Sequence, residues 1–147
     1  MSENTITPQP VLALERIYVK DLSFESPNVL KSLSTKWEPE LQLDMNTKVN
    51  RLEEKIFEVI LGLTVTVKNA GEVAYICEVQ QAGIFKSDGM DEAALKKMLG
   101  CDAPGVLYPF GREVVSSLVS RGGYPQLMLK PVDFEGLYAE ALSLIHI

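Results

Sequence analysis

Apolar and polar residues alternate along the first half of the chain, which is the pattern of β-strands that bury one face. Residues 12–24 form the first alternating segment, although charged residues interrupt it at Lys20 and Asp21. Turn-forming residues follow at 25–28, and a second alternation follows Pro39. Because successive side chains of a strand point to opposite faces, each segment predicts a strand with one apolar and one polar face.

Two further strands are predicted at residues 56–67 and 73–85. The first is rich in β-branched residues, and its odd-numbered positions are all apolar. The connection at residues 68–72 contains Asn69 and Gly71, which favour a tight hairpin turn. We therefore expect four antiparallel strands that follow one another as a meander.

The segment from Ile76 to Phe85 differs from an ordinary half-buried strand, because neither of its faces is cleanly apolar. One face carries a carboxylate and the other an uncharged amide. With alternating sides, the two faces are Ile76, Glu78, Gln80 and Ala82 against Cys77, Val79, Gln81 and Gly83. Two different surfaces are therefore expected to meet this strand, one wet and one dry. Such a strand is typical of a protein that works by association rather than by chemistry.

The second half of the chain changes to a helical period. A short helix is predicted at residues 91–100, with acids in its first turn, lysines in its last turn and Gly100 at its end. Another follows from Pro104 to a stop at residues 121–123, and a last one begins after a capping Asp133. Strands followed by helices predict an α+β fold, with the helices on one face of a four-stranded antiparallel sheet.

Composition narrows the class of protein. The chain of 147 residues fits one domain, and 46% hydrophobic against 23% charged residues is too apolar for disorder. We expect a flexible arm at residues 1–10, the folded domain at 11–142 and a short end at 143–147. The net charge of −6 argues against nucleic-acid binding, which needs a basic footprint. The chain start is no signal peptide and no apolar run approaches a membrane span, so we expect a cytosolic protein that does not insert into membranes.

Candidate catalytic groups are scattered along the chain. The one histidine, His146, is penultimate, and a rigid catalytic setting is not expected there. Cys77 and Cys101 have no partner histidine nearby, so packed thiols are favoured. The chain has no glycine-rich phosphate loop and no cluster of metal ligands. We expect no enzyme, no cofactor and no metal, although an enzyme that uses an aromatic groove as its pocket stays open as a remote alternative.

Acidic and aromatic residues form the two remaining constellations. Asp21, Glu25 and Glu78 fall on or beside strands, and they would form an acidic docking patch if those strands are neighbours. Aromatic residues, two of them stiffened by adjacent prolines, would wall an apolar groove for varied side chains. They are Trp37, Tyr75, Tyr108, Phe110, Phe134 and Tyr138, and some of them must instead pack in the core.

Four segments resemble one known family. They are RIYVKDLSFESPN at 16–28, CEVQQAGIF at 77–85, LYPFGRE at 107–113 and SRGGYPQL at 120–127. In this order they resemble the SecB protein-export chaperones, and the likeness spans residues 12–142. The resemblance implies an ATP-independent cytosolic holdase of bacteria, which keeps unfolded precursor proteins competent for translocation and passes them to the motor ATPase SecA. It also implies a homotetramer, built as a dimer of dimers that stack through their helices.

The resemblance also assigns candidate site residues. It implies a SecA-docking surface at Asp21, Glu25, Ile76 and Glu78, and a contribution to tetramer assembly from Cys77, Val79 and Gln81. It makes Trp37, Tyr75, Tyr108, Phe134 and Tyr138 candidate walls of the client groove. The family ends in a polar, acidic tail that contacts SecA, whereas residues 142–147 here are apolar. A chaperone of the same fold that is dedicated to one client, or to a toxin–antitoxin system, is the alternative.

Overall fold

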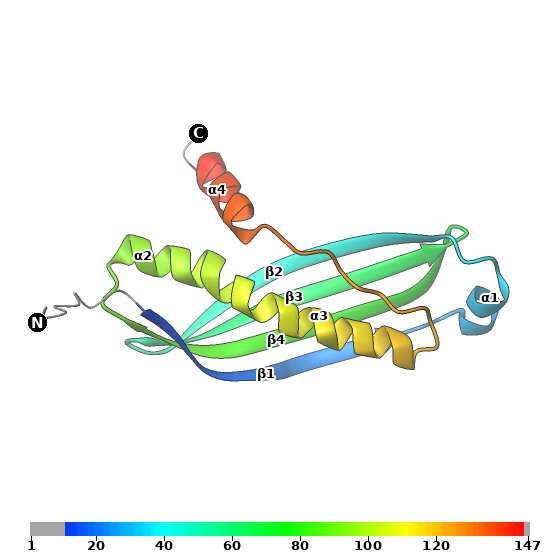
Figure 1. Ribbon diagram of the computed structural model, residues 1–147, viewed down its shortest axis with the longest axis horizontal. Coiled ribbons are helices and arrows are strands. Elements are labelled where there is room, and N and C mark those ends of the chain that lie inside the picture. Colours follow the sequence, from blue (N-terminus) through cyan, green and yellow to red (C-terminus); the bar gives the residue numbers. More distant parts are fainter. Residues whose placement is uncertain (1–10, 146–147) are drawn as a thin grey trace, which may run out of the picture.

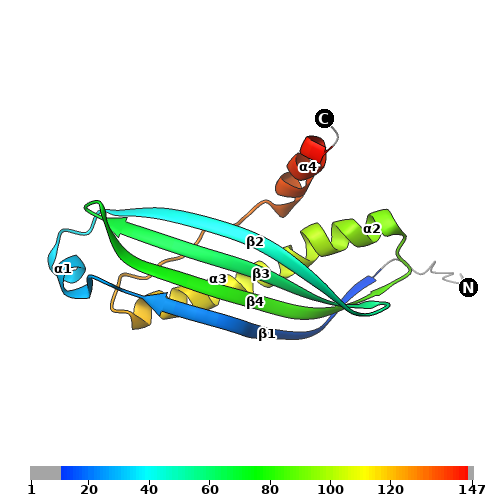
Figure 2. The same ribbon diagram turned by 180° about the vertical axis from the view of Figure 1, so that it is seen from behind.

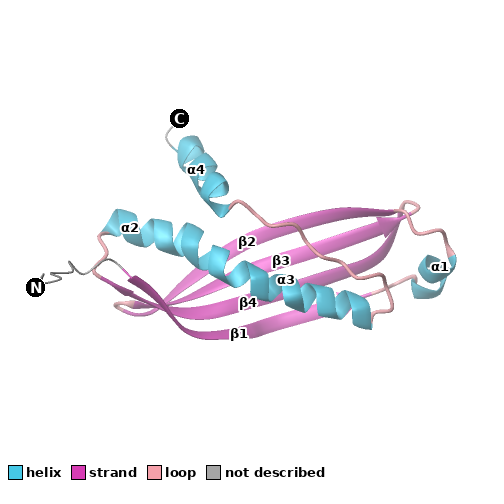
Figure 3. Cartoon of the chain, viewed as in Figure 1, coloured by secondary structure: helices cyan, strands magenta, loops and turns pink. Residues whose placement is uncertain are grey.

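A four-stranded antiparallel sheet carries a long helix across one face in the computed structural model, which describes residues 11–145 (Figures 1 and 3). The α+β fold predicted from the sequence is therefore confirmed. In chain order the elements are β1 (Val11–Glu25), α1 (Val29–Ser34), β2 (Pro39–Glu53), β3 (Ile56–Asn69), β4 (Glu72–Asp88), α2 (Glu92–Lys97), η1 (Met98–Asp102), α3 (Ala103–Arg121) and α4 (Phe134–Ile145). The arm predicted at residues 1–10 lies outside the described residues.

The strands lie in the order β1-β4-β3-β2, and all neighbouring pairs are antiparallel. The predicted meander holds for β2, β3 and β4, but it is wrong for β1, which pairs with β4 instead of β2. The chain leaves β1 through α1 at one end of the sheet and enters β2 on the far edge (Figure 2). This crossover leaves β1 and β2 as the two edge strands.

Two single-residue β-bulges interrupt β1. Its register against β4 shifts between Leu14 and Arg16, and again between Val19 and Asp21. Each extra residue reverses the alternation of faces, so the apolar positions change from even to odd numbers and back again. All of them therefore stay on the side of α3, and they are Leu12, Leu14, Ile17, Val19, Leu22 and Phe24. The charged interruption seen in the sequence marks the second bulge.

The hydrophobic core lies between α3 and the two central strands. Odd-numbered residues of β3 and β4 face the helix and, apart from the half-buried Val73, are buried. In β3 this is the apolar face that the alternation predicted. The hairpin between these strands turns at Ala70 and Gly71, whose φ angles of 55° and 79° are those of a tight turn. The largest fully buried aliphatic side chains of this core include Leu61, Leu63, Val65, Val79, Leu107, Val115 and Val119.

The helix predicted to end at Gly100 does not end there. The π-helical turn η1 joins α2 to α3, so the chain remains helical up to Arg121 (Figure 1). Gly100 instead leaves room for the last helix, because a Cβ atom at this position would lie 3.1 Å from the Tyr138 ring. The predicted helix end at Gly100 was therefore wrong. The glycine allows close packing against α4 and does not end a helix.

The last helix, α4, begins as predicted with Asp133 as its cap. The Asp133 carboxylate accepts a hydrogen bond from the Gly136 amide at 3.0 Å. The helix extends to Ile145, so the domain boundary expected at residue 142 falls inside it, and His146 lies outside the described residues. Among residues 11–145, no helix combines the length and apolar character needed to cross a membrane.

Candidate functional site

The four candidate docking residues share the face of the sheet that points away from α3. Glu25 on β1 lies opposite Ile76 on β4, and Asp21 lies opposite Gln80, two residues beyond Glu78. Residues directly opposite each other in a sheet point to the same side. The structure therefore brings these four side chains, from segments more than 50 positions apart in the chain, into one surface on β1 and β4.

This surface continues across β3 to β2. Thr64 lies between Glu78 on β4 and Asp44 on β2, and the Asp44 carboxylate accepts a hydrogen bond from Gln42 at 3.1 Å. Sequence reasoning missed Asp44, although the alternation of the second strand placed it on a polar face. We call this surface the acidic face, and its four carboxylates are those of Asp21, Glu25, Asp44 and Glu78. Among residues 11–145, none of these four carboxylates forms an ion pair, so each is free to attract a basic group of another chain.

The candidate assembly residues lie on the opposite face, below α3. Cys77 and Val79 are fully buried, and Gln81 is 3% exposed. Burial, followed by the nearby charge of Glu78, raises the pKa of the Cys77 thiol to about 11, so it stays a neutral packed thiol. Cys77 and Val79 thus belong to the core of the protomer and support the position of α3.

Gln81 is the member of this set that reaches a surface cavity. Its amide nitrogen donates to the Tyr18 carbonyl at 3.1 Å, whereas its carbonyl oxygen has no partner within the described residues. The cavity measures about 440 Å³ and lies between the edge strand β1 and α3. Val19 and Phe110 lie partly exposed beside it, so the groove is largely apolar.

The candidate groove aromatics form two separate groups. Trp37 and Tyr75 belong to the first, in which the Tyr124 ring lies 5.5 Å and 4.9 Å from theirs, and Phe24 stacks on Tyr75 at 5.5 Å. Tyr75 is only 1% exposed and is a core residue, while Trp37 is half-buried. Sequence reasoning did not assign Phe24 to the groove, because only the tertiary fold brings it beside Tyr75.

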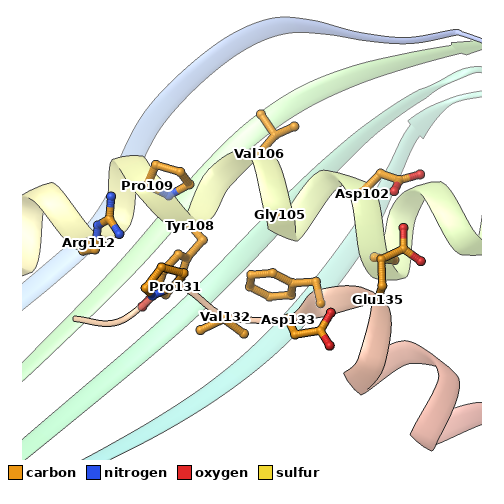
Figure 4. Close-up of a pocket in the computed structure, with 12 residues that line it drawn as sticks. Asp102, Gly105, Val106, Tyr108, Pro109, Arg112, Pro131, Val132, Asp133 and Glu135 are labelled. Atoms are coloured by element: carbon orange, nitrogen blue, oxygen red, sulfur yellow. The ribbon is translucent and has the colours of Figure 1, made fainter.

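Tyr108, which Figure 4 shows on α3, lies in the N-terminal half of this helix and forms the second group with Phe134, the first residue of α4. Their rings pack edge to face at 5.7 Å, and the Tyr108 hydroxyl donates to the Lys130 carbonyl at 2.5 Å. Burial raises the pKa of Tyr108, which therefore remains a neutral donor. Both rings line a cavity of about 680 Å³, together with Arg112 and Pro131.

Tyr138 on α4 lies near this second group, packed against Gly100. A smaller cavity of about 210 Å³ separates α4 from β2 and is lined by Met45, Phe134 and Tyr138. The extended chain at residues 124–133 connects the two aromatic groups and crosses the sheet beside α3 (Figure 1). The five candidate aromatics therefore lie at the two ends of the extended chain at residues 124–133, and we call the surface along this chain the path. Two of the five, Tyr75 and Tyr108, are buried beneath it.

Exposed apolar side chains accompany this path. Leu41 on β2 and Met128 in the extended chain are 49% and 57% exposed, and the neighbouring Leu127 is half-buried. A protomer that leaves such side chains in water has apolar surface available for another chain. The path along residues 124–133 therefore combines buried aromatic rings with exposed, flexible aliphatic side chains.

One further cluster lies beside the larger cavity. The Cys101 thiol and the carboxylates of Asp102 and Glu135 have ligand atoms within 4.8 Å of one another. The Lys97 ammonium lies 3.3 Å from Glu135, and burial raises the pKa of Cys101. A neutral thiol and a carboxylate already paired with lysine describe an ion pair between α2 and α4 rather than a metal centre.

The fold and these surfaces define an α+β binding protein with an acidic face on one side of its sheet and apolar grooves on the other. The family described as preprotein translocase subunit SecB matches residues 5–144, and the chain belongs to the SecB family. The protein-export protein SecB of Hahella chejuensis is 46% identical over 144 residues, which cover 97% of this chain and 91% of that protein. The protein-export protein SecB of Pseudomonas fluorescens is 49% identical over 144 residues, covering 96% and 91%.

A solved structure shares the fold. The SecB-like chaperone of Mycobacterium tuberculosis, in complex with a ChAD peptide from the HigA1 antitoxin, superposes with a TM-score of 0.69. The likeness covers 82% of this chain and 90% of that one at 17% sequence identity. At this identity the similarity bears on the fold alone.

Proposed function

We propose that this protein is a cytoplasmic chaperone of protein export that holds unfolded precursor proteins and delivers them to SecA. Membership of the SecB family over nearly the whole chain is the observation that carries the proposal. The protein performs no reaction in this proposal and uses no ATP or other cofactor. Binding and release of clients then depend only on the affinities of its surfaces.

Client binding takes place along the path between the two aromatic groups. An unfolded chain exposes apolar side chains, and burying them gains roughly 25 cal/mol per Å² of apolar surface. Trp37 and Phe134 offer ring surface at the two ends, while Met128 and Leu41 offer adaptable surface between them. Contacts of this kind select for apolar character and not for one sequence, which suits many clients.

SecA docks on the acidic face, on the opposite side of the sheet. Four exposed carboxylates attract a basic partner and raise its association rate, most strongly at low ionic strength. Ile76 supplies an apolar contact within the charged surface. Because clients and SecA use opposite sides of one sheet, both can be bound at once, and transfer follows when SecA competes for the client.

We further propose assembly into a homotetramer through the other exposed apolar surfaces. The edge strand β1 and the groove beside Gln81 are suited to cover one another in two copies, and Cys77 and Val79 hold α3 in place for the contact between dimers. Native mass spectrometry at micromolar concentration is expected to give four copies of the chain. A stable monomer would contradict this assembly, and a stable dimer would contradict the contact between dimers.

Suppression of aggregation tests the holding activity. An unfolded client diluted from denaturant is expected to scatter no light when equimolar protein is present without ATP. Trp37→Ala is expected to raise the amount of protein needed by roughly threefold, because truncation of a tryptophan removes one of the strongest kinds of binding contact. Leu52→Ala is the control, since Leu52 is exposed at the other end of β2. Full aggregation with the unaltered protein would contradict the proposal.

A second function is a chaperone dedicated to one client, for which the peptide complex of the M. tuberculosis protein is the precedent. Affinity capture under native conditions separates the two functions. Many unrelated precursor proteins together with SecA are expected for the export chaperone. One dominant partner and no SecA would favour the dedicated form.

A further inference from the structure

Glu58 is a buried carboxylate on the outer face of the sheet, and the proposed function gives it no role. Glu58 lies on β3 and is 8% exposed, and the side chains of three other residues contact its carboxylate. The Tyr18 hydroxyl donates to it, the Lys20 ammonium lies 2.9 Å and 3.1 Å from its two oxygens, and the Asn50 amide donates at 2.9 Å. This cluster therefore joins three strands by side chains alone.

The contacts from β1 reach across an intervening strand. Tyr18 lies opposite Ala82 on β4, and Ala82 in turn lies opposite Ile60 on β3. The small side chain of Ala82 leaves space for the Tyr18 ring to extend over β4 toward Glu58. A charged hydrogen-bonded contact that spans a neighbouring strand holds β1 in one position relative to β3.

The two residues of β1 in this cluster sit at the second β-bulge. Tyr18 precedes it, and Lys20 is the extra residue between Val19 and Asp21. After Val19, which points toward α3, unbroken alternation would turn Asp21 and Glu25 toward α3 as well. The extra residue reverses this, so both carboxylates point outward and lie opposite Gln80 and Ile76. Because the first bulge has already reversed the alternation once, the acidic face on β1 depends on this second bulge.

We propose that Glu58 is a positioning residue for SecA docking: it grips Tyr18 and Lys20 and thereby fixes the bulge that turns Asp21 and Glu25 onto the acidic face. The inference rests on the proposed docking function. Glu58 itself contacts no partner, because its oxygens are already taken by residues of this chain. It also keeps the Lys20 ammonium away from Asp21, so the adjacent cation does not neutralise the face.

The ionisation of Glu58 supports a permanent grip. Hydrogen bonds from Tyr18, then Asn50 and Lys20, lower the pKa of Glu58 to about 2. Burial and the adjacent Glu58 raise the pKa of Tyr18 to about 12, so its hydroxyl remains a donor. The cluster therefore keeps the same protonation state at every pH at which a cell operates.

The test compares SecA affinity with local backbone opening. Glu58→Gln keeps the size of the side chain but removes its charge, and Lys20→Gln removes the partner charge from the exposed side. Glu58→Gln is expected to weaken SecA binding about fivefold, equivalent to roughly 1 kcal/mol. Hydrogen exchange of the amides in residues 19–25 is expected to quicken about tenfold, because local opening of an edge strand becomes easier. Lys20→Gln is expected to change both in the same direction.

Controls separate positioning from general stability. Glu72→Gln removes another glutamate that pairs with a lysine, at 2.7 Å from Lys31, and is expected to change neither measurement. A purely structural role for Glu58 would quicken exchange throughout β3 and β4 and weaken client holding to the same degree, which would overturn the proposal. Unchanged exchange at residues 19–25 would also overturn it.

Failure of the docking proposal itself is recognised separately. Asp21→Asn removes a charge of the acidic face without touching the cluster, so it is expected to weaken SecA binding on its own. If Asp21→Asn has no effect on SecA affinity, the docking surface is wrong. If Asp21→Asn weakens binding but Glu58→Gln does not, the docking surface stands and the positioning role falls.

Discussion

Glu78→Lys is expected to weaken SecA binding at least roughly tenfold, which corresponds to about 1.4 kcal/mol, while client holding stays unchanged. Glu78 is exposed on β4, between Ile76 and Gln80, and lies opposite Ser23 on β1. A lysine there places a cation among the three other carboxylates of the acidic face. The substitution thus removes one attraction for a basic partner and adds one repulsion.

The measurement is titration of SecA with the variant at two salt concentrations. The loss of affinity is expected to shrink as salt rises, because salt screens exposed charges. Glu53→Lys makes the same change of charge at the last residue of β2, outside the acidic face, and is the control. If Glu78→Lys weakens client holding as much as SecA binding, the variant is misfolded and the two sides of the sheet are not independent. If it leaves SecA binding intact, the acidic face is not the docking surface.

Gly122→Ala is expected to destabilise the fold by about 1–3 kcal/mol, the usual cost of overpacking a well-packed site. A Cβ atom on Gly122 would lie 2.4 Å from the Phe24 ring, which is stacked on Tyr75. An aromatic ring held on its other face has little freedom to move away. The end of α3 or the strand β1 must shift, and the first aromatic group is disturbed with it.

Thermal unfolding followed by circular dichroism measures this effect, and the melting temperature is expected to fall by roughly 3–10 °C. Gly105→Ala, inside α3, is the control, since a Cβ atom there would meet only Phe134, at 3.9 Å. This control is expected to be neutral or stabilising by up to about 1 kcal/mol, because alanine favours helix over glycine. Equal melting temperatures for the two variants would show that Gly122 does not limit the packing at Phe24.

Local patterns predicted much of the fold because they act over a few residues. Alternation in β4 separated Cys77 and Val79 from Glu78, and the structure places the first two under the helix and Glu78 on the outer face. The broken alternation around Lys20 was visible in the sequence, and the structure explains it as a bulge. Asp133 could be recognised as a helix cap, since capping depends only on the next turn.

Long-range features could not be read from local patterns. The pairing of β1 with β4 depends on a crossover whose route is set by tertiary packing. Gly100 matched the local pattern of a helix end. Its lack of a side chain instead leaves room for the ring of Tyr138, which lies 38 positions later in the chain. The aromatic residues were predicted as one constellation, and their division into two groups follows from the return of the chain at residues 124–133.

The two bulges of β1 have an arithmetic consequence for how this strand can vary in length. Each adds one residue, so together they add two, and Leu12 and Leu14 share even numbers with Leu22 and Phe24. If the same residues formed a strand without either bulge, its two ends would keep their sides, and Arg16, Ile17, Tyr18 and Val19 between the bulges would change sides. If only one bulge were lost, every residue beyond that point would turn to the opposite face of the sheet. The even or odd numbering of the apolar positions in β1 is therefore constrained more tightly than the length of the strand.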